Sequence, residues 1–262
     1  MALFLPGPNH PLWFNIRVLF VATPRISMNF LTKYYSDEGH LRVSRQQASD
    51  FAKKVAGDFN PIHDVDSTRF CVPGDLLFAL VLHKYGLSQH MDFVFKGMVG
   101  DGVELIFPDA GTNPITITDS HGKSYLSIER GGEVTMDQEL IQALTRRYVE
   151  FSGQTFPHIL VPLLTQHKVM LNPERPLVIY ESMAIHMDRL DIKDPTLELA
   201  NSTLNVEGKR GHVSLEFSIK AEGKVVGKGT KSLVLSGLRT FEQHDIDHLV
   251  NNYSVRKQAY LS

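Results

Sequence analysis

The residues best suited to do chemistry lie in one short string, residues 57–63, which read Gly-Asp-Phe-Asn-Pro-Ile-His. The string places a carboxylate, Asp58, and an imidazole, His63, five residues apart across a proline turn. Pro61 fixes its own φ and pushes Asn60 into an extended conformation, and an asparagine side chain can bond to neighbouring backbone. We therefore predict a rigid loop that aims Asp58 and His63 at one point, where the pair polarises a shared water and returns a proton in the reverse reaction.

The string resembles the signature of the MaoC-like family, which includes the R-specific enoyl-CoA hydratases. That family carries Gly-Asp-x-Asn-Pro-x-His after a helix, and residues 57–63 match it without a gap. The resemblance covers residues 40–130 and implies a hot-dog fold, in which a curved antiparallel sheet wraps a long central helix. It also implies that Asp58 and His63 are the catalytic pair, which activates a water for addition to the double bond of an enoyl thioester, while Asn60 positions the loop.

Further substrate-binding residues follow from the same resemblance. We expect Asn60, Phe70, Gly74 and Asp75 beside the substrate, with the backbone N–H of Gly74 at a helix N-terminus, where a thioester carbonyl gains from the helix dipole. Two features depart from the hydratases: the loop after His63 is shorter, and Asp75 adds a carboxylate. Asp75 is interpreted either as the N-cap of the helix or as a group that disfavours a developing enolate.

The elements that position this loop can be predicted from local patterns. Ser44 and Gln47 form a capping box at the start of a helix over residues 45–55, which Gly57 ends. Residues 76–82 are apolar on every side, which is typical of a buried central helix. Short β-prone runs separated by turn residues follow at residues 93–98, 103–107, 115–118 and 125–128.

The same order of elements then recurs. An amphipathic helix over residues 137–151 and an apolar segment over residues 159–170 precede four β-prone runs, at residues 177–188, 197–206, 212–221 and 224–235. Gly57 has an equivalent 96 residues later, Gly153, but Gln154 and Phe156 replace the aspartate and the asparagine of the motif. The second copy is therefore predicted to lack catalysis and to serve as a scaffold or an acyl-chain pocket.

These patterns predict an α+β chain built as a double hot-dog. Residues 28–135 are expected to form the hot-dog that carries the motif, residues 136–239 the hot-dog with the degenerate motif, and residues 240–262 a helical tail. Residues 1–27 are interpreted as an N-terminal extension, either disordered or the product of a misplaced start, with a docked edge strand as the alternative. Uncovered sheet edges favour a homodimer.

Composition limits the class of partner. The formal net charge is −2, so no global field attracts nucleic acid, and no apolar run is long enough to cross a membrane. The single cysteine, Cys71, suits a reducing compartment, so we expect a cytoplasmic protein.

No metal or cofactor is expected, because His63, Asp64 and Asp66 lack a dependable third ligand. Lys224, Lys228 and Lys231 are interpreted as solvated surface lysines, with contact to coenzyme A phosphates as the alternative.

Three functions remain open from the sequence. The first is a hydratase or dehydratase, an (R)-specific enoyl-CoA hydratase-like lyase of fatty acid metabolism that acts on an acyl-CoA or acyl-carrier thioester. The second is a non-catalytic module that binds acyl thioesters or has a regulatory role, and the third is an acyl-CoA thioesterase. Because one fold hosts all of these, the fold alone does not choose between them. The length of the acyl chain and the nature of the carrier are open as well.

Overall fold

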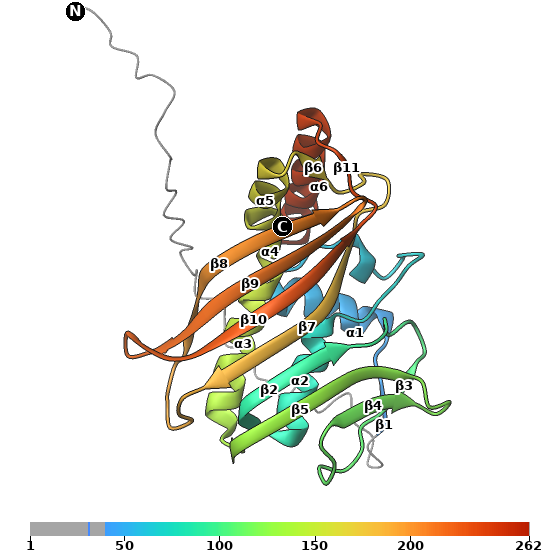
Figure 1. The fold of residues 1–262 in the computed structure, drawn as a ribbon. Coiled ribbons are helices and arrows are strands. Elements are labelled where there is room, and N and C mark those ends of the chain that lie inside the picture. Colours follow the sequence, from blue (N-terminus) through green and yellow to red (C-terminus); the bar gives the residue numbers. More distant parts are fainter. Residues whose placement is uncertain (1–30, 32–39, 262) are drawn as a thin grey trace, which may run out of the picture.

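The computed structural model describes residue 31 and residues 40–261, so the predicted extension over residues 1–27 lies outside the described part of the chain. Nine strands form one antiparallel sheet that curves over the helices on one face (Figure 1). In sheet order they are β1 (His40–Arg42), β3 (Glu104–Ile106), β4 (Ile115–Asp119), β5 (Ser124–Thr135), β2 (Leu87–Phe95), β7 (Leu177–Met187), β10 (Lys224–Ser236), β9 (Arg210–Ala221) and β8 (Thr196–Glu207). The α+β class is as predicted.

The helix before the motif forms as its sequence indicates. α1 (Arg45–Asp50) begins at Ser44, whose side chain accepts from the backbone of Gln47 while the Gln47 side chain accepts from the backbone of Ser44. The helix continues as the π-helical segment η2 (Phe51–Ala56) and ends at Gly57, which adopts φ 67°. Glycine takes this left-handed conformation without steric cost, so the chain can turn directly into the motif loop.

The central helix of the first half is α2 (Gly74–Tyr85). Leu76, Phe78, Leu80 and Leu82 are completely buried, and the Phe78 ring packs edge-on against Phe93 of β2 at 5.3 Å between centroids. A helix that buries every side must be enclosed by other elements, and here the sheet and α3 (Gln138–Gly153) enclose it.

The second half has a smaller core of its own. After α3 the chain forms α4 (Thr155–His158) and α5 (Leu160–Gln166), and the leucines of α5 pack against β8, β9 and β10. A two-stranded sheet of β6 (Val169–Met170) and β11 (Arg239–Thr240) lies beside α5, and α6 (Gln243–Leu261) follows it (Figure 1). The four long strands predicted for this half are all present.

Three contacts unite the two halves. β2 pairs with β7 from His90–His186 to Val94–Ser182, which makes the sheet continuous. The helix ends also meet, because a Cβ atom added to Gly153 would lie 1.8 Å from the carbonyl oxygen of Ala56. The hydroxyl of Tyr253 on α6 donates to the carbonyl of Gly57 at 3.1 Å and lies 3.4 Å from that of Gly153. These two glycines are the equivalent positions of the predicted repeat.

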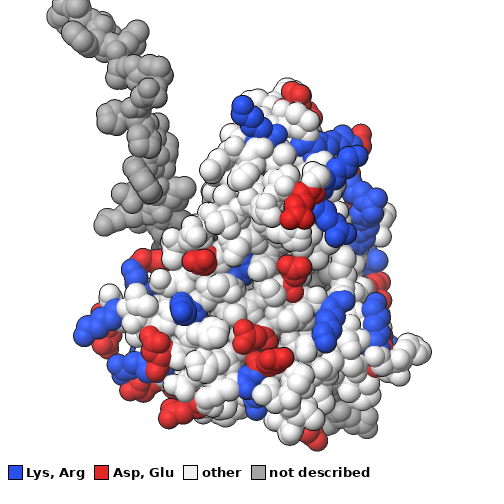
Figure 2. Space-filling model, in the orientation of Figure 1, with Lys and Arg blue, Asp and Glu red and all other residues white. Residues whose placement is uncertain are grey.

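Charged side chains of both signs are spread over the face of the molecule shown in Figure 2. Among the described helices, none combines the length and the apolar character that a bilayer crossing requires.

Candidate functional site

The motif forms a tight turn that its own side chains hold. The carboxylate of Asp58 accepts from the backbone N–H of Asn60 at 2.8 Å, and the Asn60 side-chain oxygen accepts from the N–H of Ile62 at 3.2 Å. The 3₁₀ turn η3 (Pro61–His63) follows, with Asn60 extended at ψ 124°. The asparagine therefore holds the loop as the sequence predicts, and the turn brings His63 back towards Asp58.

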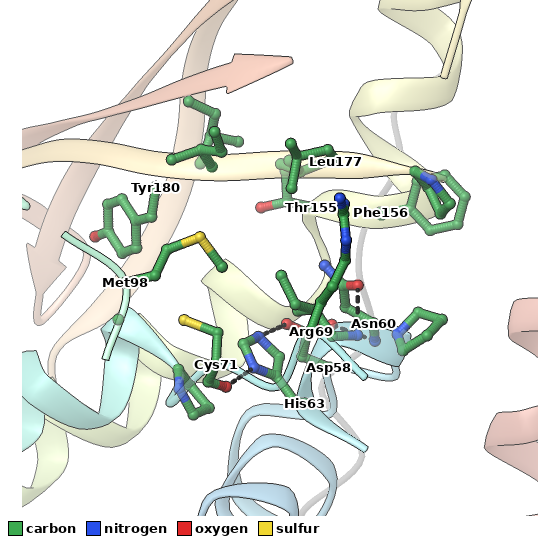
Figure 3. A pocket seen from close by; sticks show the side chains of 18 of the residues that line it. Asp58, Asn60, His63, Arg69, Cys71, Met98, Thr155, Phe156, Leu177 and Tyr180 are labelled. Carbon is green, nitrogen blue, oxygen red and sulfur yellow. Dashed lines mark hydrogen bonds and ion pairs between the residues drawn. The ribbon is translucent and has the colours of Figure 1, made fainter. Parts of the chain in front are cut away.

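The carboxylate and the imidazole lie side by side. His63 Nε2 is 3.6 Å from Asp58 Oδ2, and His63 Nδ1 is 2.7 Å from the carbonyl oxygen of Cys71 (Figure 3). Because a carbonyl oxygen only accepts, Nδ1 must carry the proton, and Nε2 of the neutral imidazole is then an acceptor. Two acceptors at this separation can each take one hydrogen of a single water. The pair can therefore hold a water and draw a proton from it.

The pair opens onto a cavity of 660 Å³ that both halves line. Thr155 and Phe156 of α4 and Tyr180 of β7 lie across the cavity from Asp58 and His63 (Figure 3). The second half thus supplies a wall of the same cavity. α6 contributes further lining residues, which are Leu249, Asn252, Tyr253 and Arg256.

A buried polar cluster occupies another part of this cavity. Ser152 of α3 donates to Asp75 Oδ2, and Lys231 of β10 donates to the Ser152 hydroxyl. Lys231 Nζ also lies 3.9 Å from Asp75 Oδ1 and 4.2 Å from the centre of the Tyr180 ring. Lys231 is only 4% exposed and Asp75 7%. The interpretation of Lys231 as a surface lysine is therefore wrong.

Burial sets the electrostatics of this cluster. It raises the pKa of Asp75, an effect that the Lys231 ammonium and the Ser152 hydroxyl oppose. It lowers the pKa of Lys231, and the carboxylates of Asp75 and Asp58 oppose that shift. The N-cap of α2 is Pro73, and Asp75 stands in the first turn, so the interpretation of Asp75 as the N-cap is wrong as well. Its carboxylate is instead part of an ion pair.

The other expected binding residues have different positions. Gly74 is the first residue of α2 and lines the cavity, and a Cβ atom there would lie 2.7 Å from the Tyr180 ring and 3.1 Å from the Phe95 ring. Asn60 also lines the cavity. Phe70 does not belong to the lining: it is buried, with the Arg45 guanidinium 4.9 Å from its ring centre.

Two further motif neighbours have structural partners. Burial raises the pKa of the Cys71 thiol to about 11, so the thiol stays protonated and is a poor nucleophile. Asp64 pairs with Lys53 at 2.8 Å and with Arg256 at 2.5 Å, which ties α6 to the motif loop. Within the part of the chain that the structure describes, no group of three or more His, Cys, Asp or Glu residues is placed to hold a metal ion.

Sequence reasoning missed Ser152 and Lys231. A signal for Lys231 exists, because it lies two and four residues before Leu233 and Leu235 and so faces the same side of β10, where both leucines are buried. A lysine at an inward position of an alternating strand is a buried lysine by register. Ser152 continues the buried face of α3 after Leu144 and Tyr148, but this spacing does not indicate which group its hydroxyl will bond.

Solved structures with a related arrangement have low sequence identity. The TesB protein of Mycobacterium avium subs paratuberculosis has 7% identity and a TM-score of 0.43, over 80% of this chain and 99% of that one. A conserved hot-dog protein of unknown function from Alicyclobacillus acidocaldarius has 10% identity and a TM-score of 0.43, over 77% and 95%. A MaoC-like dehydratase has 11% identity and a TM-score of 0.40, over 79% and 97%.

No curated protein matches the sequence. A family model does match, over residues 28–244, and its description is "Protein of unknown function (DUF3581)". This match includes the motif loop, the Asp75–Ser152–Lys231 cluster and all nine strands of the large sheet. The chain therefore belongs to the DUF3581 family.

Proposed function

We propose that this protein hydrates an enoyl thioester, or dehydrates the corresponding hydroxyacyl thioester, with Asp58 and His63 as the acid–base pair. The observation that carries the proposal is the pair itself: two acceptors 3.6 Å apart, beside a cavity, with the imidazole fixed by the Cys71 carbonyl. Hydration needs a water held by two groups, one of which takes its proton and returns it later.

The reaction balances with these groups alone. The pair draws a proton from the bound water, and the water oxygen forms a bond to the β-carbon of the enoyl group. The electrons of the carbon–carbon double bond move towards the thioester carbonyl, which becomes an enolate oxygen. The pair then gives the proton to the α-carbon, and the product is a 3-hydroxyacyl thioester. Dehydration is the same path in reverse.

The dimensions and charges of the cavity support an acyl thioester as the ligand. A volume of 660 Å³ falls in the range of small-molecule sites, roughly 300–1,000 Å³. Arg69, Lys96 and Arg175 are exposed residues among those that line it, and their charges suit the phosphates of coenzyme A or of a phosphopantetheine carrier. The two helices α2 and α5, each packed in its own core under one sheet, suit the double hot-dog that the sequence predicts.

The test is turnover of enoyl-CoA thioesters. Purified protein is mixed with crotonyl-CoA and with longer enoyl-CoAs, and the enoyl absorbance is followed. We expect loss of the absorbance that disappears in Asp58→Asn and persists in the control Asp66→Asn, which alters an exposed carboxylate of the same loop. Release of free thiol would instead identify a thioesterase, and ligand binding without turnover a binding module. Either result would overturn the hydratase proposal.

A further inference from the structure

The cluster of Asp75, Ser152 and Lys231 has no part in the water chemistry above, yet it lines the same cavity. It also lies near the catalytic pair, because the Asp58 carboxylate contributes to the pKa shifts of both Asp75 and Lys231. The cluster joins the first turn of α2, the end of α3 and the middle of β10, so both halves build it. A buried lysine in a ligand cavity calls for a partner.

The hydrogen bonds of Lys231 leave room for such a partner. An ammonium has three N–H donors. One donates to Ser152, and the Tyr180 ring lies 4.2 Å from Nζ. Asp75 Oδ1 is 3.9 Å away, which is too far for a direct hydrogen bond. Among the described residues, Ser152 is thus the only hydrogen-bond acceptor that Nζ reaches, and a donor remains for a ligand.

Unpartnered atoms in the cavity point to a ligand independently. Asp75 Oδ1 is buried and has no hydrogen-bond partner among the described residues, and the same holds for the hydroxyl of Thr155, another residue that lines the cavity. Buried polar atoms are almost always satisfied, and a polar ligand reached by a small rotation of these side chains would supply the missing partner. The cavity that both residues line is the space for it.

We propose that Lys231 is a further catalytic residue of this site, whose ammonium binds the carbonyl oxygen of the thioester as negative charge develops there. The inference rests on the proposed function and refines it. The Lys231 ammonium adds positive charge beside the first turn of α2, where Gly74 stands, and the N-terminus of that helix also favours negative charge on the ligand. No bond to Lys231 forms or breaks. The hydrogen bond from Nζ strengthens as the enolate forms and weakens as the α-carbon is protonated.

Asp75 and Ser152 act on the substrate only through Lys231, so they are positioning residues. Ser152 bridges the two charged groups, which fixes Nζ without a direct contact between lysine and carboxylate. The Asp75 carboxylate favours the ammonium form of the buried lysine, because its charge opposes the lowering of the lysine pKa by burial. The added carboxylate therefore does not exclude an enolate, since Lys231 accompanies it.

The experiment uses acetoacetyl-CoA, a β-keto thioester that ionises to an enolate with its own ultraviolet band and cannot be hydrated. The full-length protein is saturated with it, and the enolate band is measured as a function of pH. We expect the wild type to bind the enolate form, so that the apparent pKa of the bound thioester falls below its value in solution. In Lys231→Met the ratio of enolate to keto form should fall at least about tenfold, which is one pKa unit.

Matched variants exclude a merely structural effect. Lys228→Met, an exposed lysine three residues away on the same strand, should leave the enolate ratio unchanged. In Asp75→Asn the lysine loses its proton more readily, so the enolate ratio should fall relative to the wild type as pH rises and approach the wild-type ratio at lower pH, whereas a general loosening of the cavity would lower it at every pH. The double variant Asp75→Asn/Lys231→Met leaves no unpaired charge behind, so it should fold and should still show the tenfold loss.

The outcomes separate the two proposals. An unchanged enolate ratio in both Lys231 variants, a loss in Asp75→Asn that equals the loss in Lys231→Met at every pH, or no binding of acetoacetyl-CoA to the wild type would overturn the role of Lys231. If crotonyl-CoA is hydrated in that case, only the inference about Lys231 fails. If the enolate ratio depends on Lys231 but no enoyl-CoA is hydrated, the hydratase proposal fails and the carbonyl-binding site remains.

Discussion

The buried pair of Asp75 and Lys231 makes a sharp prediction about stability. We consider Lys231→Met, Asp75→Asn and the double variant. Either single substitution leaves one ionisable group buried without its partner, since Lys231 is 4% and Asp75 7% exposed. Breaking a buried ion pair from one side typically costs about 3–5 kcal/mol, whereas replacing both partners with uncharged residues of similar volume is often neutral.

The structure places the single variants at the lower end of that range. Burial raises the pKa of Asp75 and lowers that of Lys231, so the group left behind can lose its charge instead of remaining ionised. We expect each single variant to lose about 3 kcal/mol in free energy of unfolding near neutral pH and the double variant to lie within about 1 kcal/mol of the wild type. The two substitutions would then be strongly non-additive.

The pH dependence gives each single variant its own signature. In Lys231→Met the acid left behind has a raised folded-state pKa, so stability falls as pH rises and recovers towards about pH 5. In Asp75→Asn the base left behind has a lowered folded-state pKa, so stability falls as pH drops and recovers towards about pH 9. Urea unfolding at several pH values measures both trends. Additive costs in the double variant, or the same pH trend in both single variants, would refute the reasoning.

Three further predictions concern the join, the tail and the thiol. Gly153→Ala should lose more than about 1 kcal/mol of stability in urea unfolding, because its Cβ would clash with backbone, while Gly100→Ala, which meets nothing within 4 Å, should be neutral. Arg256→Met removes the 2.5 Å ion pair to Asp64, and hydrogen exchange over α6 should rise with little change in global stability; unchanged exchange would contradict that link. Cys71, with a pKa of about 11 against an ordinary 9.0, should alkylate about a hundredfold more slowly in the native protein at pH 8 than in urea, and equal rates would show that the thiol is exposed.

Local sequence chemistry is sufficient for much of this fold. The capping box at Ser44, the left-handed Gly57 and the all-apolar central helix depend on residues close in sequence, and the structure has each of them. The strands of the first half were harder to delimit. β2 begins at Leu87, six residues before the predicted start at residue 93, because a register shift between Ser88 and His90 interrupts the alternation that marks a strand.

The candidate site was predictable only in the part that a single loop supplies. Asp58 and His63 are five residues apart, so a turn is enough to bring them together. The cluster of Asp75, Ser152 and Lys231 spans 156 residues of chain and forms only when three distant elements pack. Pattern and propensity describe neighbours in sequence, and they carry no information on which inward lysine will meet which helix end.

The unbroken sheet has a consequence for how molecules reach the cavity. Because β2 and β7 pair directly, the two halves share one continuous sheet, which does not allow them to rotate apart about a hinge. Passage in and out must then depend on a smaller movement. Helix α6 lines the cavity and follows the last strand, so it can move without disturbing the large sheet. It is held to the motif loop mainly by side chains. Movement of α6 should therefore set the rate at which ligands enter and leave the cavity.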